Sequence, residues 1–305
     1  MGERPGRATP SWARGAQVAE RVRLLELVTA RLSRGVTYGS YASASYGSGG
    51  DRGEAAEYHP GDDVRHIDWA ASARTATLTV RLTHAEREAR VAVVVDGAPS
   101  MAFGTEALTK HEMAVCVAAA VTRAASVGGN PVLLAHATTD GPRWEDVPPG
   151  RTTALPVLQR LAGQHPRLDH PGASTLATTL GQLGRRFARV DLVVVVSDLH
   201  AEGWQRPLRG LAQERPVVVV APYDRRERDL VAVGDLALAG GDHLVDLATD
   251  DPAVLVRWRE EAAGLAAERE AAARGAGARY VEVACDAEVE DDVLAVLRQV
   301  TRVRA

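Results

Sequence analysis

The chain has 305 residues, a formal net charge of −4 at pH 7 and 46% hydrophobic residues, enough apolar material to bury a sizeable core. The mild acidity argues against a dedicated nucleic-acid binder, and the two cysteines are too few for a disulfide framework or a four-thiolate zinc site. No apolar run approaches the roughly 18 residues of a membrane helix, and no secretory signal opens the chain, so we expect a soluble, cytoplasmic protein.

The first 88 residues differ in composition from the rest. We expect a flexible N-terminus over residues 1–15 and an N-terminal helix plus extension over 16–88. A helix is predicted over 17–32 because its apolar residues share one stripe: Val18, Val22, Leu25, Val28 and Leu32. Residues 77–83 alternate between apolar and polar, which predicts a half-buried strand with Leu78, Val80 and Leu82 on one face.

From residue 89 to 305, short β-branched runs alternate with helical patterns. Residues 91–95, 192–196 and 217–221 are apolar on both faces, as strands buried on both sides must be. Further strands are expected over 131–137 and 279–283, and a polar loop around Trp144. Helices are predicted over 106–126, 153–162, 175–187, 204–213, 252–274 and 289–300. This alternation predicts an α/β domain with a doubly wound, mostly parallel sheet.

Two of the buried strands end in oxygen-bearing side chains. One is followed by Asp96 and Ser100, the other by Ser197 and Asp198, and a small-residue loop at 172–175 lies between them in the sequence. Ligands of open α/β sheets sit beyond the carboxyl ends of the strands, near the switch in strand order. Carboxylates and hydroxyls gathered there would suit a hard divalent cation, although an aspartate at a strand end is also a common helix cap.

This arrangement resembles the metal-ion-dependent adhesion site of von Willebrand factor A domains. The resemblance implies a von Willebrand A-like domain that binds Mg²⁺ or Mn²⁺ through Asp96, Ser100, Ser174 and Asp198, with Thr175 as the neighbouring alternative to Ser174. Ala98 stands where the pattern has its first serine. Because a methyl group cannot ligate a metal, we expect a weakened, degenerate site.

A more specific resemblance lies upstream. Residues 57–69 (EYHPGDDVRHIDW), with Ala-Arg-Thr at 73–75 and Glu-Arg-Glu at 86–88, resemble the signature of the bacterial family catalogued as domain of unknown function 58 (DUF58). Proteins of that family carry a von Willebrand A-like domain after the signature. The resemblance implies a MoxR-type AAA+ ATPase as partner and a role in chaperone-like assembly or maturation.

Within the signature, His and Asp residues at short spacing could form a catalytic group, but a structural bracket or a partner-docking surface fits the pattern better. Pro60 and Gly61 introduce a turn, Ile67 and Trp69 are expected to anchor the segment in the core, and arginines can pair with Asp68. The residues assigned to this structural or partner motif are Tyr58, Pro60, Gly61, Asp62, Asp63, Arg65, Asp68, Trp69 and Arg74.

Three functions follow from the sequence. The first is a non-enzymatic interaction module without nucleotide chemistry of its own, because the only lysine, Lys110, falls in a predicted helix and no P-loop is present. The second is a metal-dependent hydrolase in which Asp96 and Asp198 hold the cation and His66 acts as base. The third is a metal-free scaffold, suggested by Ala98.

Overall fold

The computed structural model describes residues 55–59, 67–81, 89–150, 153–166, 174–187, 189–240, 243–286 and 289–301. The predicted helix over 17–32 and the expected flexible N-terminus lie outside these ranges. Among the described residues, no helix has the length and apolar character needed to cross a bilayer.

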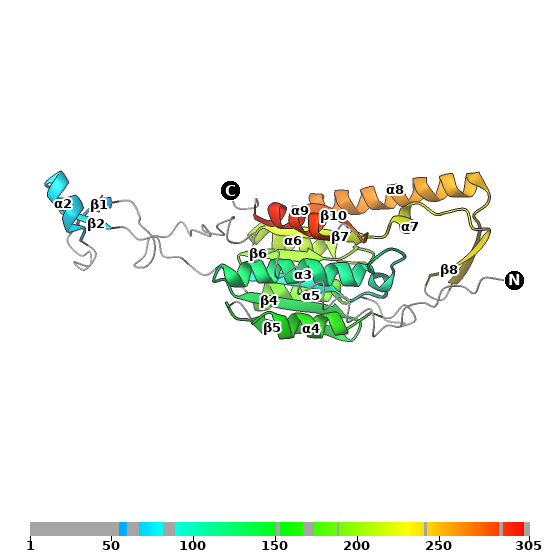
Figure 1. Ribbon diagram of the computed structural model, residues 1–305, viewed down its shortest axis with the longest axis horizontal. Helices are drawn as coiled ribbons and strands as arrows, with labels where there is room; N and C mark the ends of the chain where they lie inside the picture. Colours follow the sequence, from blue (N-terminus) through cyan, green and yellow to red (C-terminus); the bar gives the residue numbers. More distant parts are fainter. Residues whose placement is uncertain are drawn as a thin grey trace.

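A six-stranded sheet forms the centre of the molecule (Figure 1). Its strands are β3 (Val91–Asp96), β4 (Val132–Thr138), β5 (Gly141–Val147), β6 (Leu192–Val196), β7 (Val217–Tyr223) and β10 (Arg279–Ala284). They lie in the order β10-β7-β6-β3-β4-β5, and every neighbouring pair is parallel except β4 and β5. This is the strand order of a doubly wound sheet, so the predicted α/β fold is confirmed.

Helices cover both faces of the sheet, which explains why β3, β6 and most of β7 are buried along their length. One face packs against α3 (Lys110–Val127), α4 (Leu155–Gly163) and α9 (Val289–Thr301). The other packs against α5 (Leu176–Arg186), α6 (Gln205–Glu214) and the end of α8 (Pro252–Gly275). Valine, leucine and alanine fill both cores, as the scarcity of aromatic residues predicts.

The prediction of a polar loop around Trp144 is wrong. Residues Gly141–Val147 form the antiparallel edge strand β5. An edge strand pairs on one side only and faces solvent along much of its length, so it carries polar residues and lacks the apolar run of a central strand. Trp144 packs against Phe187, with ring centroids 5.1 Å apart.

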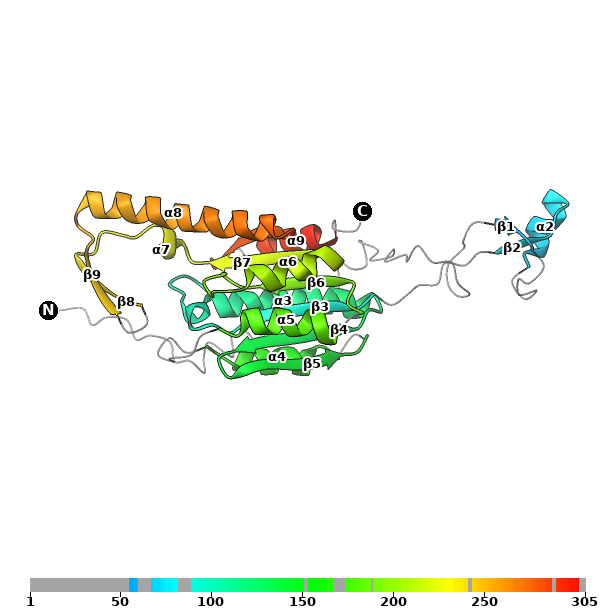
Figure 2. The same cartoon turned by 180° about the vertical axis from the view of Figure 1, so that it is seen from behind.

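Beyond the sheet lies a region with a short helix and a hairpin that were not predicted from the sequence. After β7 come the short helix α7 (Arg225–Arg228) and an antiparallel hairpin of β8 (Asp235–Gly240) and β9 (His243–Ala248). Figures 1 and 2 show α8 extending past the edge of the sheet to reach this hairpin.

The family-like signature folds in part as a small unit. β1 (Ala55–Glu57) pairs antiparallel with β2 (Thr79–Arg81), and α2 (Trp69–Thr75) lies between them in sequence. The expected strand over 77–83 is therefore present from Thr79, and Leu82 lies outside the described residues. Val80 is buried as predicted, whereas Leu78 is 46% exposed and precedes the strand.

Candidate functional site

The candidate site lies where the strand order switches direction. β3 and β6 are neighbours at the centre of the sheet, and the chain leaves them toward opposite edges. Asp96 is the last residue of β3, and Asp198 follows β6 by two residues. The two carboxylates predicted to meet at one sheet edge therefore do so.

Asp96 is buried and held by hydroxyl and amide donors. Its Oδ1 accepts hydrogen bonds from the Ala98 backbone N–H (3.0 Å) and the Ser174 hydroxyl (2.8 Å), and its Oδ2 accepts one from the Ser197 hydroxyl (2.6 Å). Burial, together with the charge of Asp198, raises the pKa of Asp96 to about 6 against the lowering effect of these hydrogen bonds.

Asp198 has a different partner, the only lysine of the chain. The Lys110 ammonium donates to Asp198 Oδ2 at 2.7 Å and to Glu227 Oε1 at 2.5 Å, while the His200 backbone N–H donates to Asp198 Oδ1 at 3.1 Å. Burial alone would raise the pKa of Asp198, but the adjacent ammonium lowers it to about 2. The two carboxylates in turn raise the pKa of Lys110 against the effect of burial.

The local sequence explains how Lys110 is positioned. Thr109 and Glu112 form a capping box, in which each side chain bonds the other's backbone N–H, so α3 begins at Lys110. A cation in the first turn of a helix is disfavoured by the helix dipole. Asp198 and Glu227 offset that cost, and Lys110 is completely buried between them.

A second capping box fixes Glu227. Asp224 caps α7, and Glu227 Oε2 accepts from the Asp224 N–H at 3.1 Å. Asp224 also accepts from the backbone N–H and the hydroxyl of Thr105, at 2.5 and 2.8 Å. The Trp258 indole N–H donates to the Glu227 carbonyl at 3.0 Å, which ties α7 to α8. The site is therefore braced from α3, α7 and α8.

Each of the two strand-end loops is locally constrained, one by its backbone conformation and the other by a close neighbouring side chain. Leu199 adopts a φ of 56° directly after Asp198, a conformation that non-glycine residues rarely take, and its N–H donates to the Ser197 hydroxyl at 2.9 Å. Gly97 follows Asp96, and a Cβ at that position would lie 2.7 Å from His136 Nε2. Any larger residue after Asp96 would therefore force the His136 side chain to move.

The predicted metal ligands surround this edge, but they do not fit a divalent cation as placed. The Ser174 hydroxyl donates a hydrogen bond to Asp96, and the hydroxyl of the alternative, Thr175, donates one to the Thr138 carbonyl. Ser100 lies in the 3-10 helix η2 (Pro99–Ala102), and its hydroxyl is buried without a partner among the described residues. Asp198 is paired with an ammonium and Ala98 offers a methyl group, so two positions that the adhesion pattern gives to oxygen ligands are not free to bind a cation. The described residues hold no group of three or more His, Cys, Asp or Glu suited to a metal.

Only part of the predicted signature motif is described. Asp68 caps α2 by accepting from the Ala71 N–H at 3.0 Å, the Tyr58 N–H donates to the Leu78 carbonyl at 2.7 Å, and Arg74 is exposed. Trp69 was expected in the core, and that prediction is wrong, because it opens α2 on the solvent side and is 70% exposed. The remaining members, with the candidate base His66, lie outside the described residues: Pro60, Gly61, Asp62, Asp63 and Arg65.

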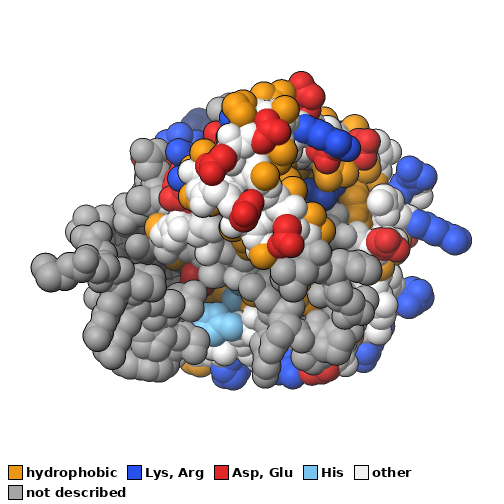
Figure 3. Space-filling view, turned by 90° about the vertical axis from the view of Figure 1, so that its right-hand side faces the viewer, with side chains coloured by type: hydrophobic (Ala, Val, Ile, Leu, Met, Phe, Trp, Pro, Cys, Tyr) orange, Lys and Arg blue, Asp and Glu red, His pale blue; other side chains and the backbone are white. Residues whose placement is uncertain are grey.

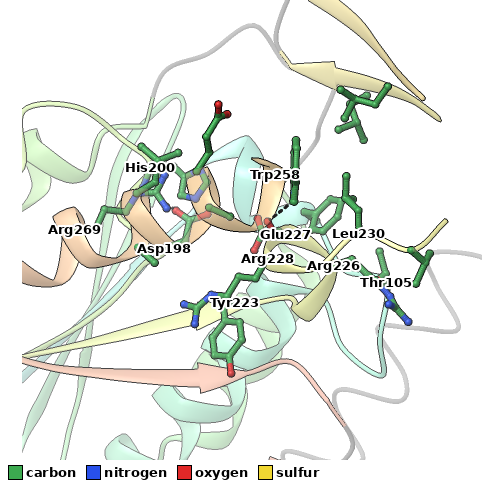
Figure 4. A pocket seen from close by; sticks show the side chains of 18 of the residues that line it. Thr105, Asp198, His200, Tyr223, Arg226, Glu227, Arg228, Leu230, Trp258 and Arg269 are labelled. Carbon is green, nitrogen blue, oxygen red and sulfur yellow. Dashed lines mark hydrogen bonds between the residues drawn. The ribbon is translucent and has the colours of Figure 1, made fainter. Parts of the chain in front are cut away.

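A large cavity opens beside Asp198. Its volume is about 1040 Å³, and it is bounded by α7, α8, the β8–β9 hairpin and the ends of β7 and β10. Figure 4 shows Asp198, His200 and Arg269 together on one side of it, Arg226 and Thr105 on the other, and Trp258 between them. Figure 3 looks onto this end of the molecule, where hydrophobic side chains are visible among charged ones. We call this cavity the α8 groove.

Sequence reasoning found both aspartates but missed the residues that determine their charge. Lys110 and Glu227 were not among the predicted site residues, and Ser197 was placed at this edge but not among the predicted ligands. One indication was present: a single lysine among 36 basic residues suggests a position that arginine cannot fill. The Asp-x-x-Glu spacing at 224–227 also predicts a capping box.

Comparisons with known proteins agree with the signature. The family model described as "Protein of unknown function DUF58" matches residues 54–270. The uncharacterized protein Rv1480 of Mycobacterium tuberculosis is 33% identical over 293 residues, covering 93% of this chain and 92% of its own, and Mb1516 of Mycobacterium bovis gives the same figures.

Two solved structures are similar at lower identity. BatB from Bacteroides thetaiotaomicron is 12% identical, with a TM-score of 0.44, and covers 71% of this chain and 98% of its own. The SpRpn10 VWA domain is 10% identical, with a TM-score of 0.40, and covers 68% of this chain and 94% of its own.

Proposed function

Because the chain belongs to the DUF58 family, we propose that it is a non-enzymatic protein-interaction module that works with a MoxR-type AAA+ ATPase in chaperone-like assembly or maturation. In this proposal the edge of the sheet around Asp96 and Asp198 is a degenerate adhesion site. Lys110 supplies the positive charge that the adhesion pattern gives to a divalent cation.

The proposal rests on the observation that both carboxylates already have hydrogen-bond or ion-pair partners within the chain. Metal-assisted hydrolysis needs a cation with an open coordination position and a water it can activate. Here Asp96 accepts three hydrogen bonds and Asp198 contacts the Lys110 ammonium at 2.7 Å. A site saturated in this way favours a binding role over the hydrolase alternative.

The partnership is tested by co-purification. The full chain is used to capture the MoxR-type ATPase from the same cell, with and without EDTA. We expect capture that does not change with EDTA, because the ammonium cannot be chelated. Failure to capture the ATPase would overturn the proposed partner, and loss of capture in EDTA would overturn the role given to Lys110.

The degenerate site is tested by calorimetric titration with MgCl₂ and MnCl₂. We expect no binding by the natural chain in the millimolar range, and measurable binding once Ala98→Ser restores a ligand and Lys110→Met removes the competing ammonium. Ala98→Ser alone serves as the control, because it adds the hydroxyl but leaves the ammonium in place. Binding by the natural chain that is lost in Asp96→Ala would show a working metal site instead.

A further inference from the structure

The α8 groove is an apolar surface that the described fold leaves open. Val231, Val233, Val245 and Leu265 line it, and each exposes between 43% and 60% of its surface. On α8, Val254, Trp258 and Leu265 contribute one wall, and their spacing of four and seven residues places them on one stripe of the helix. Exposed apolar residues gathered in one concavity mark an interaction site more often than scattered ones do.

Positive charge remains around the groove once the ion pairs within its lining are set aside. Arg228 binds Glu282 through both guanidinium nitrogens, at 2.9 and 2.5 Å, and Arg257 binds Glu261 at 2.9 Å. Asp198 and Glu227 share Lys110. Glu282 and Glu261 are thus neutralised, and the one ammonium shared by Asp198 and Glu227 leaves a single negative charge there. Arg226 and Arg269 also line the groove and have no ion pair among the described residues, so their two positive charges exceed that one negative charge. Figure 4 places these two arginines on opposite sides of the groove.

We propose that the α8 groove binds an amphipathic segment of a partner protein that carries carboxylates beside its apolar face. The apolar face would lie along Val254, Trp258 and Leu265, with its carboxylates directed to Arg226 and Arg269. The stripe on α8 runs from residue 254 to 265, about 17 Å at helical rise, which matches a ligand helix of roughly three turns. The inference rests on the proposed function only in making the chain a binding module.

The charge of the groove favours an acidic partner segment over the other amphipathic segment available, which belongs to this chain itself. The predicted N-terminal helix of this chain, residues 17–32, is also amphipathic, but it contains three arginines and two glutamates. It lacks the acidic excess that two unpaired arginines select. An acidic partner segment therefore satisfies both the apolar wall and the charge of the groove.

The test measures fluorescence anisotropy of a labelled 16-residue peptide, with leucines at helical spacing on one face and glutamates beside them, titrated with the full chain. A matched peptide has lysine in place of every glutamate. We expect saturable binding, at least about tenfold tighter for the glutamate peptide. No binding, or equal binding of the two peptides, would overturn the proposal.

Two pairs of variants locate the binding. Leu265→Glu, in the groove wall, should weaken binding about 10- to 100-fold, while Val256→Glu, equally exposed on α8 but outside the groove, should leave it within about twofold. The double variant Arg226→Glu, Arg269→Glu should abolish the preference for the glutamate peptide, and Arg209→Glu on α6 should not. Equal effects within either pair would overturn the assignment.

Other occupants give distinct results. If light scattering shows a dimer that Leu265→Glu dissociates and Val256→Glu does not, the groove binds a second copy. If the peptide binds only after Leu25→Glu, the chain's own N-terminal helix covers the groove. Either result overturns the proposal. Capture of the ATPase by a chain that binds no peptide would leave the proposed function intact and remove only this inference.

Discussion

The loops after β3 and β6 place the same side chain at the same edge of one sheet, yet give it opposite electrostatic surroundings. Asp96 is supported by hydroxyls and an amide, and its pKa rises to about 6. Asp198 is equally buried, but it contacts an ammonium and its pKa falls to about 2. Position at the sheet edge therefore does not fix the charge of a carboxylate: burial raises the pKa of Asp96, whereas an adjacent ammonium outweighs burial at Asp198.

Removing the Lys110 ammonium should have the largest effect on the difference between the two aspartates. Lys110→Met would leave Asp198 buried without its counter-charge, and we expect the free energy of unfolding to fall by about 3–5 kcal/mol in urea denaturation. The control adds Asp198→Asn to the same chain, which removes the uncompensated charge and should recover much of the loss. A single-variant loss below about 1 kcal/mol would contradict the buried pair.

The two carboxylates should also contribute opposite pH dependences. The pKa of Asp96 rises from 3.8 to about 6 on folding, so its contribution to stability is complete below 3.8 and is lost as the pH rises through 6. The pKa of Asp198 falls from 3.8 to about 2, so its contribution is present above 3.8 and is lost as the pH falls through 2. Each amounts to on the order of 2–3 kcal/mol.

Urea denaturation across pH 3–7 measures these contributions by difference. The free energy of unfolding of the natural chain minus that of Asp96→Asn should decrease between about pH 4 and 6. The free energy of unfolding of the natural chain minus that of Asp198→Asn should increase with pH below about pH 4. Two differences of the same sign would show that the carboxylates do not differ as described.

The smallest effect concerns the hydroxyls around Asp96. Ser197→Ala removes the buried 2.6 Å bond to Oδ2, and we expect a loss of about 1–2 kcal/mol and an upward shift in the midpoint assigned to Asp96. Ser174→Ala removes a 2.8 Å bond from a half-buried residue and should cost less. The reverse order would indicate that Ser174 is the main support of this carboxylate.

Much of the fold could be predicted from the sequence, because each central strand is a short valine-rich run bounded by turns. The edge strand β5 was missed since its residues face solvent and resemble a loop. The β8–β9 hairpin was missed because leucines alternate with alanines over 236–239 and no clear apolar–polar alternation results, although glycines at positions 240 and 241 are typical of a hairpin turn.

The site was only half predictable. Asp96 and Asp198 follow recognisable strands, so the topology of a doubly wound sheet brings them together. The contact between Lys110 and Asp198 spans 88 residues and depends on where α3 begins. Helical periodicity predicted a start near residue 106, whereas the Thr109–Glu112 capping box sets it at Lys110. A shift of a few residues turns a helix enough to move a side chain off the site, so this pairing required the three-dimensional structure.

Burial of the only lysine has a practical consequence for measuring the protein. An amine-reactive reagent can reach no lysine side chain while the chain is folded, because Lys110 is 0% exposed. Modification of that one ammonium by the reagent therefore records opening of the loops around α3, and mass spectrometry of a single peptide would follow it without any substitution in the chain. The rate at which Lys110 is modified would therefore measure how often this edge of the sheet opens.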